Sequence, residues 1–375
     1  MTMDRFGDKV CCNPKVKLKK QESYPVIDID QITPGYKTVR SVESVEYTGQ
    51  GGAKFQDRDV LFARITPCLE NGKMAIADTD GQNGLGSTEL FVFRGINGVS
   101  DTDYVYYLLC MKHIRQLAAN SMTGASGRQR ADLDFIKKIQ WDFPEIGAQK
   151  KIASVLSAYD NLIEVNNKRI KVLEQMAENL YKEWFVRFRF PGHETAEFEN
   201  GIPKGWEIKK AKEVIQRLPF GKLYKAEDTV TDGKVIVIDQ SQDQYVGFHN
   251  DDPSHIATPK YPIAIFGDHS CKYQLMIRPF SLSENVVPYV GKHGVPTTYL
   301  YYLTHGIVET TEYKRHWTEF MAKKLLIAPH HLQEQFSSHI MPINEAILNL
   351  EKQCRNLVKQ RDLLLPRLMS GKLEV

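Results

Sequence analysis

Hydrogen-bond donors on a glycine-rich loop are the residues of this chain best suited to chemistry. The segment TGASGRQRAD, residues 123–132, presents Arg128, Gln129 and Arg130 just after two glycines. In the major groove of DNA, arginine pairs with guanine and glutamine pairs with adenine through two hydrogen bonds, and arginine also contacts phosphates. Glycine lets a backbone approach its ligand closely. The pattern therefore favours a base-reading loop over an ordinary solvated loop.

Further donors lie at the ends of strand-like runs. In the first half they follow DVLFARI (59–65), and in the second half they lie in GDHSCKYQ (267–274) and in the loop before the last strand. A solvated surface explains the second-half residues equally well. The complete set of predicted DNA contacts is Arg128, Gln129, Arg130, Arg64, Asn71, Lys73, His269, Lys272, Gln274, Lys314, Arg315 and His316.

Motifs of catalysis are missing from the chain. The sequence has no GxxxxGK[ST] phosphate loop, no GxGxxG after a strand and no Pro-Pro dipeptide. The last absence excludes the Asn/Asp-Pro-Pro-aromatic tetrapeptide of enzymes that methylate exocyclic amino groups. We therefore expect no catalytic residue and no bound cofactor.

One cluster has the chemistry of zinc ligands without the spacing of a zinc site. It comprises His249, His255, Asp268, His269 and Cys271, whose intervals fit no known zinc motif. We interpret these histidines as ordinary surface or core residues and expect no metal. The six cysteines include no CxxC pair, so reduced thiols are expected.

Composition places the chain among globular proteins of two or three domains. It has 375 residues, of which 42% are hydrophobic and 25% charged, with a net charge of +3. That balance permits nucleic-acid binding without arguing for it. No apolar run is long enough for a membrane helix, and residues 1–20 lack a signal-peptide core, so we expect a cytoplasmic protein.

An internal repeat organises the elements that position these donors. The segments DTDYVYYLLCMK (101–112) and VPTTYLYYLTH (295–305) share a Tyr-x-Tyr-Tyr-Leu core. FIKKIQWDFPEIGAQKKI (135–152) likewise resembles FMAKKLLIAPHHLQEQF (320–336). Each half contains short strand-like runs, so we expect two similar mixed α/β blocks. For the tyrosines, core packing is favoured over stacking on bases.

Each half ends in a long helix with an apolar seam. The seam positions are separated by alternating steps of four and three, the period of a left-handed coiled coil. If the helices pair antiparallel, Ile152 faces Leu368 and Trp184 faces Phe336. The principal seam residues are Ile152, Leu156, Ile163, Asn166, Ile170, Leu173, Leu180, Trp184, Phe336, Ile340, Ile347, Leu350, Leu357, Leu364 and Leu368.

Two details of this pairing concern the second helix. Arg361 falls in the seam and is expected beside Tyr159, where its guanidinium would stack on the ring. Pro342 is expected to mark either the start of the second helix or a kink.

This organisation closely resembles the specificity (S) subunit of Type I restriction-modification systems. The resemblance covers nearly the whole chain, and its carriers are specific only when taken together. They are NPKVKLKKQESYPVIDID (13–30), DVLFARITPCLENGK (59–73), GSTELFVF (86–93), the helix QKKIASVLSAYDNLI to LYKEWF (149–185), GIPKGWEIKKA (201–211) and DLLLPRLMSGKLEV (362–375).

The resemblance implies a fold with two target-recognition domains and a pseudo-two-fold repeat. Both are mixed α/β domains, separated by two long antiparallel coiled-coil helices. The expected boundaries are 1–145 and 191–330 for the recognition domains, and 146–190 and 331–375 for the spacer helices.

The resemblance also implies a non-catalytic DNA reader. Each domain would read one half of a bipartite site in double-stranded DNA, and the helices would set the gap. Two modification (methyltransferase) subunits, which bind S-adenosylmethionine, would dock on the helices, and restriction (translocase and nuclease) subunits would join them. The second block departs from the first around GDHSCKYQ, so it should read a different half-site.

Two alternatives from other classes stay open at this stage. A coiled-coil adaptor that joins proteins without touching DNA would show no salt-dependent DNA binding. A combined nuclease-methyltransferase is the weaker alternative, because the sequence lacks the motifs that such an enzyme needs.

Overall fold

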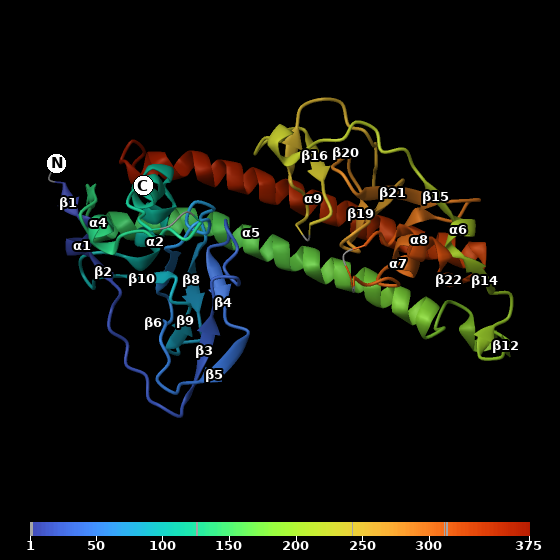
Figure 1. The fold of residues 1–375 in the computed structure, drawn as a ribbon, viewed down its shortest axis with the longest axis horizontal. Coiled ribbons are helices and arrows are strands. Elements are labelled where there is room, and N and C mark those ends of the chain that lie inside the picture. Colours follow the sequence, from blue (N-terminus) through green and yellow to red (C-terminus); the bar gives the residue numbers. More distant parts are fainter. Residues whose placement is uncertain (1–2, 125–126, 242, 311, 313) are drawn as a thin grey trace. The chain divides into compact units, whose positions relative to one another are not determined.

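The computed structural model describes residues 3–124, 127–241, 243–310, 312 and 314–375. The chain divides into two compact units. The first unit holds residues 1–166 together with 353–375, so both chain termini belong to it, and the second unit holds residues 167–352 (Figure 1). No helix within the described residues is long and apolar enough to cross a membrane. The domain boundaries expected from sequence stay a prediction.

The first unit is built on two sheets, with short helices packed around them. The larger sheet has the order β2-β10-β7-β8-β4 and the smaller has the order β5-β3-β9-β6. Their strands are β2 (Val10–Cys12), β10 (Leu90–Gly95), β7 (Val60–Ala63), β8 (Met74–Asp78), β4 (Thr38–Arg40), β5 (Glu43–Glu46), β3 (Ser23–Ile27), β9 (Gly84–Gly86) and β6 (Ala53–Phe55). The pair β1 (Asp4–Arg5) with β11 (Gln140–Trp141) and helices α1 (Phe6–Lys9), α2 (Thr102–Cys110), α3 (Lys112–Asn120) and α4 (Leu133–Lys137) complete it.

The second unit repeats this plan with one strand fewer in each of the two corresponding sheets. Its main sheet has the order β15-β21-β18-β19, and a smaller sheet has the order β17-β16-β20. The strands are β15 (Ile215–Arg217), β21 (Val286–Gly291), β18 (Ile263–Gly267), β19 (Tyr273–Met276), β17 (Gly247–His249), β16 (Val235–Ile238) and β20 (Phe280–Leu282). Around them lie the pairs β14 (Glu207–Lys210) with β22 (Lys324–Ile327) and β12 (Phe198–Glu199) with β13 (Ile202–Pro203), and helices α6 (Ala211–Val214), α7 (Thr297–Thr304) and α8 (Trp317–Ala322).

The two units therefore share one topology. The antiparallel order β2-β10-β7-β8 of the first unit matches β15-β21-β18-β19 of the second. The parallel pair of β3 with β9 matches the parallel pair of β16 with β20, and the pair β1 with β11 matches β14 with β22. A tyrosine-bearing helix follows the equivalent strand in each unit: α2 follows β10, and α7 follows β21. The expected repeat of two mixed α/β blocks is present. Among the described residues, the first unit adds β4 at the outer edge of β8 and β6 beside β9, and the second unit adds the pair β12 with β13.

Four tyrosines of the repeat pack in the cores, as expected, whereas Tyr301 and Tyr302 are only partly buried and line a cleft. Tyr104, Tyr107 and Tyr299 are at most 1% exposed, and Tyr106 is 3% exposed. Aromatic rings carry more apolar area than any other side chains, so burying them stabilises each unit. For these four residues, the spacing marks the inner face of a helix.

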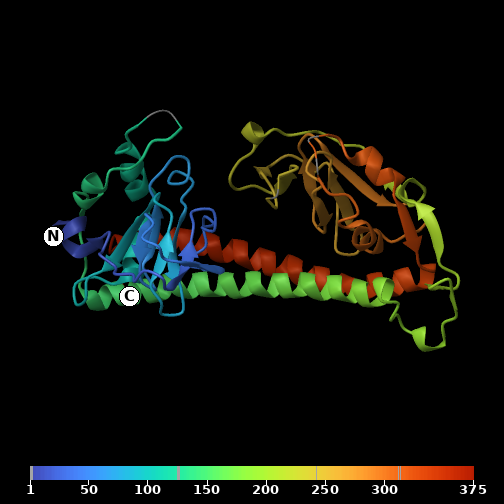
Figure 2. The same ribbon diagram turned by 60° about the horizontal axis from the view of Figure 1, so that its bottom comes forward.

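Two long helices, α5 (Ile146–Tyr181) and α9 (His330–Met369), carry the predicted seam. A turn of π-helix, Lys182–Val186, extends α5. Figure 2 shows the two helices running alongside each other within each unit. Because α9 already begins at His330, Pro342 lies inside the helix, so the expectation that it marks the helix start is wrong.

Buried glutamines anchor the starts of these helices. The Gln149 side chain donates to the carbonyl oxygens of Pro144 (2.8 Å) and Val99 (3.0 Å) and accepts from the Asp101 amide (3.0 Å). Gln333 donates to the Ala328 carbonyl at 2.7 Å. These bonds tie the first turn of each helix to backbone groups that precede it, so they fix where the chain turns from its last strand into the helix.

The seam contacts run antiparallel in each unit. In the first unit, Ile152 and Leu156 share a core cluster with Leu368, and the Asn166 amide donates to Gln353 Oε1 at 3.3 Å. In the second unit, Ile170 packs with Ile347 and Leu350. Trp184 contacts Phe336 with ring centroids 6.1 Å apart. These contacts confirm the antiparallel direction that the resemblance implied, and the approximate register that the heptad pattern predicted for it.

A buried carboxylate, Asp160, joins three helices of the first unit. It is 5% exposed and accepts hydrogen bonds from the Tyr107 hydroxyl of α2 (2.5 Å) and from the Arg361 guanidinium of α9 (2.5 Å). Arg361 thus contacts Asp160, where the sequence predicted stacking on Tyr159. The ion pair explains the difference. Burying a carboxylate without a counter-charge costs far more free energy than leaving an aromatic ring without a stacked guanidinium.

Replacing Arg361 with alanine should destabilise the first unit by about 3–5 kcal/mol, because Asp160 would keep its burial and lose its counter-charge. Urea denaturation followed by circular dichroism measures the loss. Arg367→Ala is the matched control, since Arg367 lies exposed on the same helix. Equal effects of the two substitutions would show that the pair adds nothing.

Candidate nucleic-acid interface

In the first unit, the end of β7 meets the glycine-rich loop. Arg64, the residue after β7, donates its amide to Glu89 O (2.9 Å) and accepts at its carbonyl from the Ala131 amide (2.8 Å). Thr123 and Arg130 form a bridge across the base of the loop, which fixes its two ends. Ala125 and Ser126, at its tip, lie outside the described residues. The structure therefore brings Arg64, Gln129 and Arg130 together.

Arg130 is held by a carboxylate from the neighbouring strand end. Its guanidinium donates to both oxygens of Glu89, with contacts of 2.6, 2.8 and 3.1 Å. These hydrogen bonds lower the pKa of Glu89 below its usual value. A guanidinium held through two bonds loses most of its rotational freedom, so the remaining donors point in a defined direction.

The other first-unit candidates differ in how free they are. Arg128 is exposed and forms no ion pair with any described residue, whereas Arg64 lies over the Phe91 ring at 4.8 Å. Asn71 is exposed on the turn between β7 and β8. Lys73 donates to the Ile29 carbonyl at 3.0 Å, so its ammonium already has a partner. Arg128 and Asn71 are therefore the most available donors here.

The second unit builds the corresponding corner with the same backbone contacts. Asp268, the residue after β18, donates its amide to Asn285 O (2.8 Å) and accepts at its carbonyl from the His316 amide (2.8 Å). Asp268 thus takes the place of Arg64, and Arg315 takes the place of Arg130. The Arg315 guanidinium lies 3.8 Å from the Asp268 carboxylate and is 75% exposed. Sequence reasoning selected both arginines but missed their equivalence. Arg130 and Arg315 are 185 residues apart, the same separation as Pro144 and Pro329 of the repeat.

Three second-half candidates serve the interior of the unit. Lys272 is 7% exposed, and its ammonium donates to the carbonyl oxygens of Asp239 (3.1 Å) and Asp243 (2.5 Å). Its burial lowers the pKa of the ammonium. His316 is fully buried, and the Gln274 amide donates to the Gln244 carbonyl at 3.3 Å. These groups hold loops in place, and we leave them out of the proposed contact surface.

The remaining second-half candidates lie at or near the surface. Lys314 is exposed and lies 3.6 Å from the Glu312 carboxylate. His269 is half-buried, and its backbone amide donates to the Gln240 side chain at 3.3 Å. With Arg315 these residues form the exposed corner of the second unit.

The histidine cluster noted in the sequence does not assemble. His249 stacks on Tyr224 with ring centroids 4.0 Å apart, and His255 stacks on Phe280 at 4.9 Å. Within the described residues, no group of three His, Cys, Asp or Glu side chains is placed to hold a metal ion. All six cysteines are free thiols.

Comparison with known proteins points to one family. Residues 10–175 match the Type I restriction modification DNA specificity domain. The MjaIX specificity subunit of a Methanocaldococcus jannaschii Type I restriction enzyme is 27% identical over 96% of this chain and 90% of its own length. The MjaVIII specificity subunit of the same organism is 31% identical over 63% of this chain and 54% of its own length.

The chain is thus similar to Type I restriction enzyme specificity subunits over nearly its whole length, and residues 10–175 carry the match to the DNA specificity domain. The crystal structure of a Type I restriction-modification S subunit from M. genitalium has the same fold, with a TM-score of 0.52 and 14% identity, over 98% of this chain and 95% of that one. DNA recognition is the role of the specificity subunit, so the adaptor alternative is not favoured. The non-catalytic expectation agrees with a family named for DNA specificity.

Removing the Arg130 guanidinium should raise the pKa of Glu89 toward its usual value. Because the folded pKa is lowered, the pair stabilises the subunit at neutral pH, and this contribution is lost as the pH falls through that lowered pKa. Arg130→Ala should therefore weaken the acid dependence of stability. Carbon-detected NMR titration of the Glu89 carboxyl measures the shift. Arg128→Ala should leave this pKa unchanged, and an unchanged pKa in Arg130→Ala would disprove the contact.

Proposed function

We propose that each unit reads one half of a bipartite, asymmetric site in double-stranded DNA. The observation that carries this proposal is the equivalent placement of Arg130 and Arg315 at the same corner of the repeated sheet. Both lie on the loop that precedes the small helix α4 or α8, and both have a carboxylate nearby. The corners differ in their other donors, so they would read different half-sites.

Arginine held by a carboxylate suits recognition of guanine. A fixed guanidinium presents two parallel donors, which match the O6 and N7 acceptors of guanine. In this proposal Glu89 is a positioning residue, and Arg128, Gln129 and Asn71 supply further base or phosphate contacts. In the second unit Lys314, Arg315 and His269 take these roles. No cofactor is needed for such contacts.

The helices would dock the modification subunits. On α5, Leu162 and Val165 in the first unit and Val172 and Met176 in the second are between 50% and 59% exposed. Their spacing repeats the heptad on a face away from the buried seam. Exposed apolar residues in such an order mark a helix-docking surface. One pair in each unit would receive one of two methyltransferase subunits, to which restriction subunits would be added. The complex would act in the cytoplasm.

Arg128→Ala should lower specific DNA binding by about 1–3 kcal/mol and relax base preference in one half-site only, because it removes a base contact. Fluorescence anisotropy with DNA duplexes substituted in one half-site at a time measures both effects. The exposed Lys138→Ala serves as a control from the same unit. Equal weakening on scrambled DNA would identify Arg128 as a phosphate contact.

Removing one heptad from each helix should shorten the preferred gap. Deleting residues 162–168 from α5 together with 352–358 from α9 keeps the seam paired and removes about 10 Å of helix, or about three base pairs at roughly 3.4 Å each. Selection from duplexes with randomised gaps gives the preferred length. The α5 deletion alone should disturb the seam. A gap unchanged by the double deletion would contradict the proposed spacer role.

A further inference from the structure

Strand β4 of the first unit has no counterpart among the described residues of the second. It pairs in parallel with the outer edge of β8, where Thr38 is the partner of Ile76, and the Thr38 hydroxyl donates to Glu164 of α5 at 3.0 Å. Just before it, the Lys37 ammonium donates to Ser157 Oγ (2.6 Å), pairs with Asp103 (2.5 Å) and lies 5.3 Å from the Tyr107 ring centre. β4 therefore fills the space between the sheet and α5.

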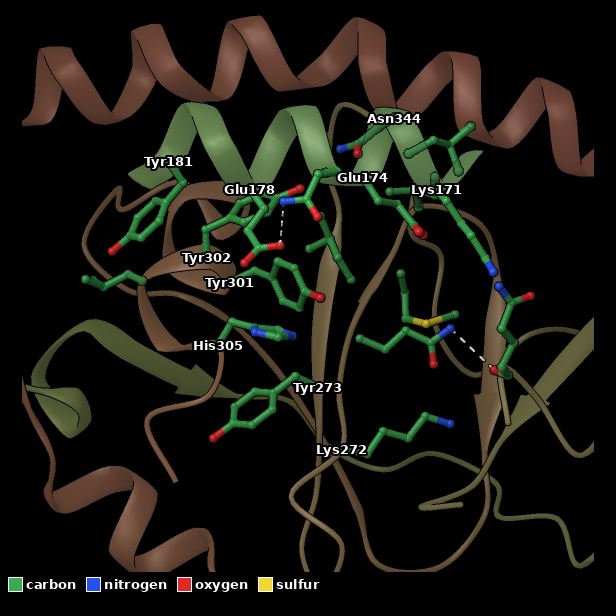
Figure 3. Close-up of a pocket in the computed structure, with 18 of the residues that line it drawn as sticks. Lys171, Glu174, Glu178, Tyr181, Lys272, Tyr273, Tyr301, Tyr302, His305 and Asn344 are labelled. Carbon is green, nitrogen blue, oxygen red and sulfur yellow. Dashed lines mark hydrogen bonds between the residues drawn. The ribbon is translucent and has the colours of Figure 1, made fainter. Parts of the chain in front are cut away.

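In the second unit the equivalent place is open. β19 corresponds to β8, and no described strand pairs with its outer edge. A cleft of about 1000 Å³ lies there, lined by every residue from Cys271 to Arg278 and by parts of α5, α7 and α9. Tyr302, the counterpart of Tyr107, lines it. Figure 3 shows Glu174, Glu178 and Tyr181 extending from α5 toward Tyr301, Tyr302 and His305.

Buried polar groups in this cleft have no partner among the described residues. Asn344 of α9 is 4% exposed, yet its Nδ2 makes no hydrogen bond, and Gln274 Oε1 is likewise unpaired. Asn344 follows Gln333 at the interval by which Asp160 follows Gln149, so it is the counterpart of the fully paired Asp160. Leaving buried polar atoms unpaired costs free energy, which a ligand with matching groups would recover.

The charges in the cleft indicate what kind of ligand fits. Glu178 pairs with Lys182 (2.5 Å) and Glu351 pairs with Arg278 (3.1 Å), whereas Glu174 has no ion pair with a described residue. Partial burial and the nearby Glu351 carboxylate raise the pKa of Glu174, against the smaller opposite effect of Lys171, which lines the same cleft. A cation from a ligand would stabilise the charged Glu174 carboxylate, whereas a phosphate backbone would repel it. The cleft therefore suits a basic side chain on an extended peptide.

We propose that an extended, basic segment of the modification subunit fills this cleft as an added strand beside β19. It would run parallel to β19, as β4 runs parallel to β8, and place a lysine or arginine between Tyr302 and Glu174. Backbone pairing supplies affinity in such strand addition, and pockets for alternate side chains supply specificity. The idea rests on the proposed function, because Val172 and Met176, the proposed docking residues, lie on the same stretch of α5.

Hydrogen exchange of the full chain, alone and with the purified modification subunit, tests the proposal. Amides of residues 272–277 should exchange at least tenfold more slowly in the complex. Glu174→Lys should remove this protection and weaken the complex about tenfold, as measured by sedimentation. Glu345→Lys is the matched control, because Glu345 is exposed on α9 and does not line the cleft.

Each other outcome overturns the proposal in a recognisable way. A complex without protection at 272–277, or equal effects of the two charge reversals, would exclude an added strand. Protection by cognate DNA alone would assign the cleft to nucleic acid. Failure to form any complex would refute the proposed docking of the modification subunit as well, while DNA reading, tested separately with Arg128→Ala, would stand. Glu174→Gln replaces Glu174→Lys if the charge reversal alters the circular dichroism spectrum.

Discussion

The buried carboxylate of Asp160 imposes the strictest requirement on this fold. It is 5% exposed, and its charge is tolerable only while Tyr107 of α2 and Arg361 of α9 both reach it. A slip of the coiled coil by one residue would move the Arg361 guanidinium away and leave the Asp160 carboxylate buried without a counter-charge. The apolar seam allows neighbouring registers at modest cost, whereas this ion pair selects one. The same contact ties the helix pair to the core of the first unit through Tyr107.

The repeat shows what a duplicated architecture can vary. Both units keep the strand order, the buried glutamine at the helix start and the corner where a loop arginine lies beside a carboxylate. They differ in the groups around that corner and in the strand at the sheet edge. Asp160 with Arg361 in one unit becomes Asn344 with an unpaired amide in the other. At this position the first unit pairs its buried polar group within its own chain, whereas the second leaves the Asn344 amide unpaired beside an open edge.

Sequence patterns predicted the parts of this fold that depend on periodicity. The seam followed from steps of four and three, and the block repeat followed from the shared tyrosines, because both patterns report which face of a helix is buried. The antiparallel direction came from the family resemblance. Individual contacts were harder to predict. Lys272 and His316 have the chemistry of DNA contacts, but tertiary packing buries them against backbone carbonyls and loops. The equal intervals from Gln149 to Asp160 and from Gln333 to Asn344 were visible in the sequence. Only the burial of Asp160 and Asn344 in the structure showed that these two positions matter.

The first unit is assembled from two segments far apart in the sequence, whereas the second unit is one uninterrupted stretch, residues 167–352. During synthesis the first unit therefore cannot close until the ribosome has released the last helix, and until then Asp160 lacks its counter-ion. The second unit emerges whole and can fold earlier. A contiguous middle is also the easiest part for recombination to exchange, since one cassette replaces a complete unit without breaking the other.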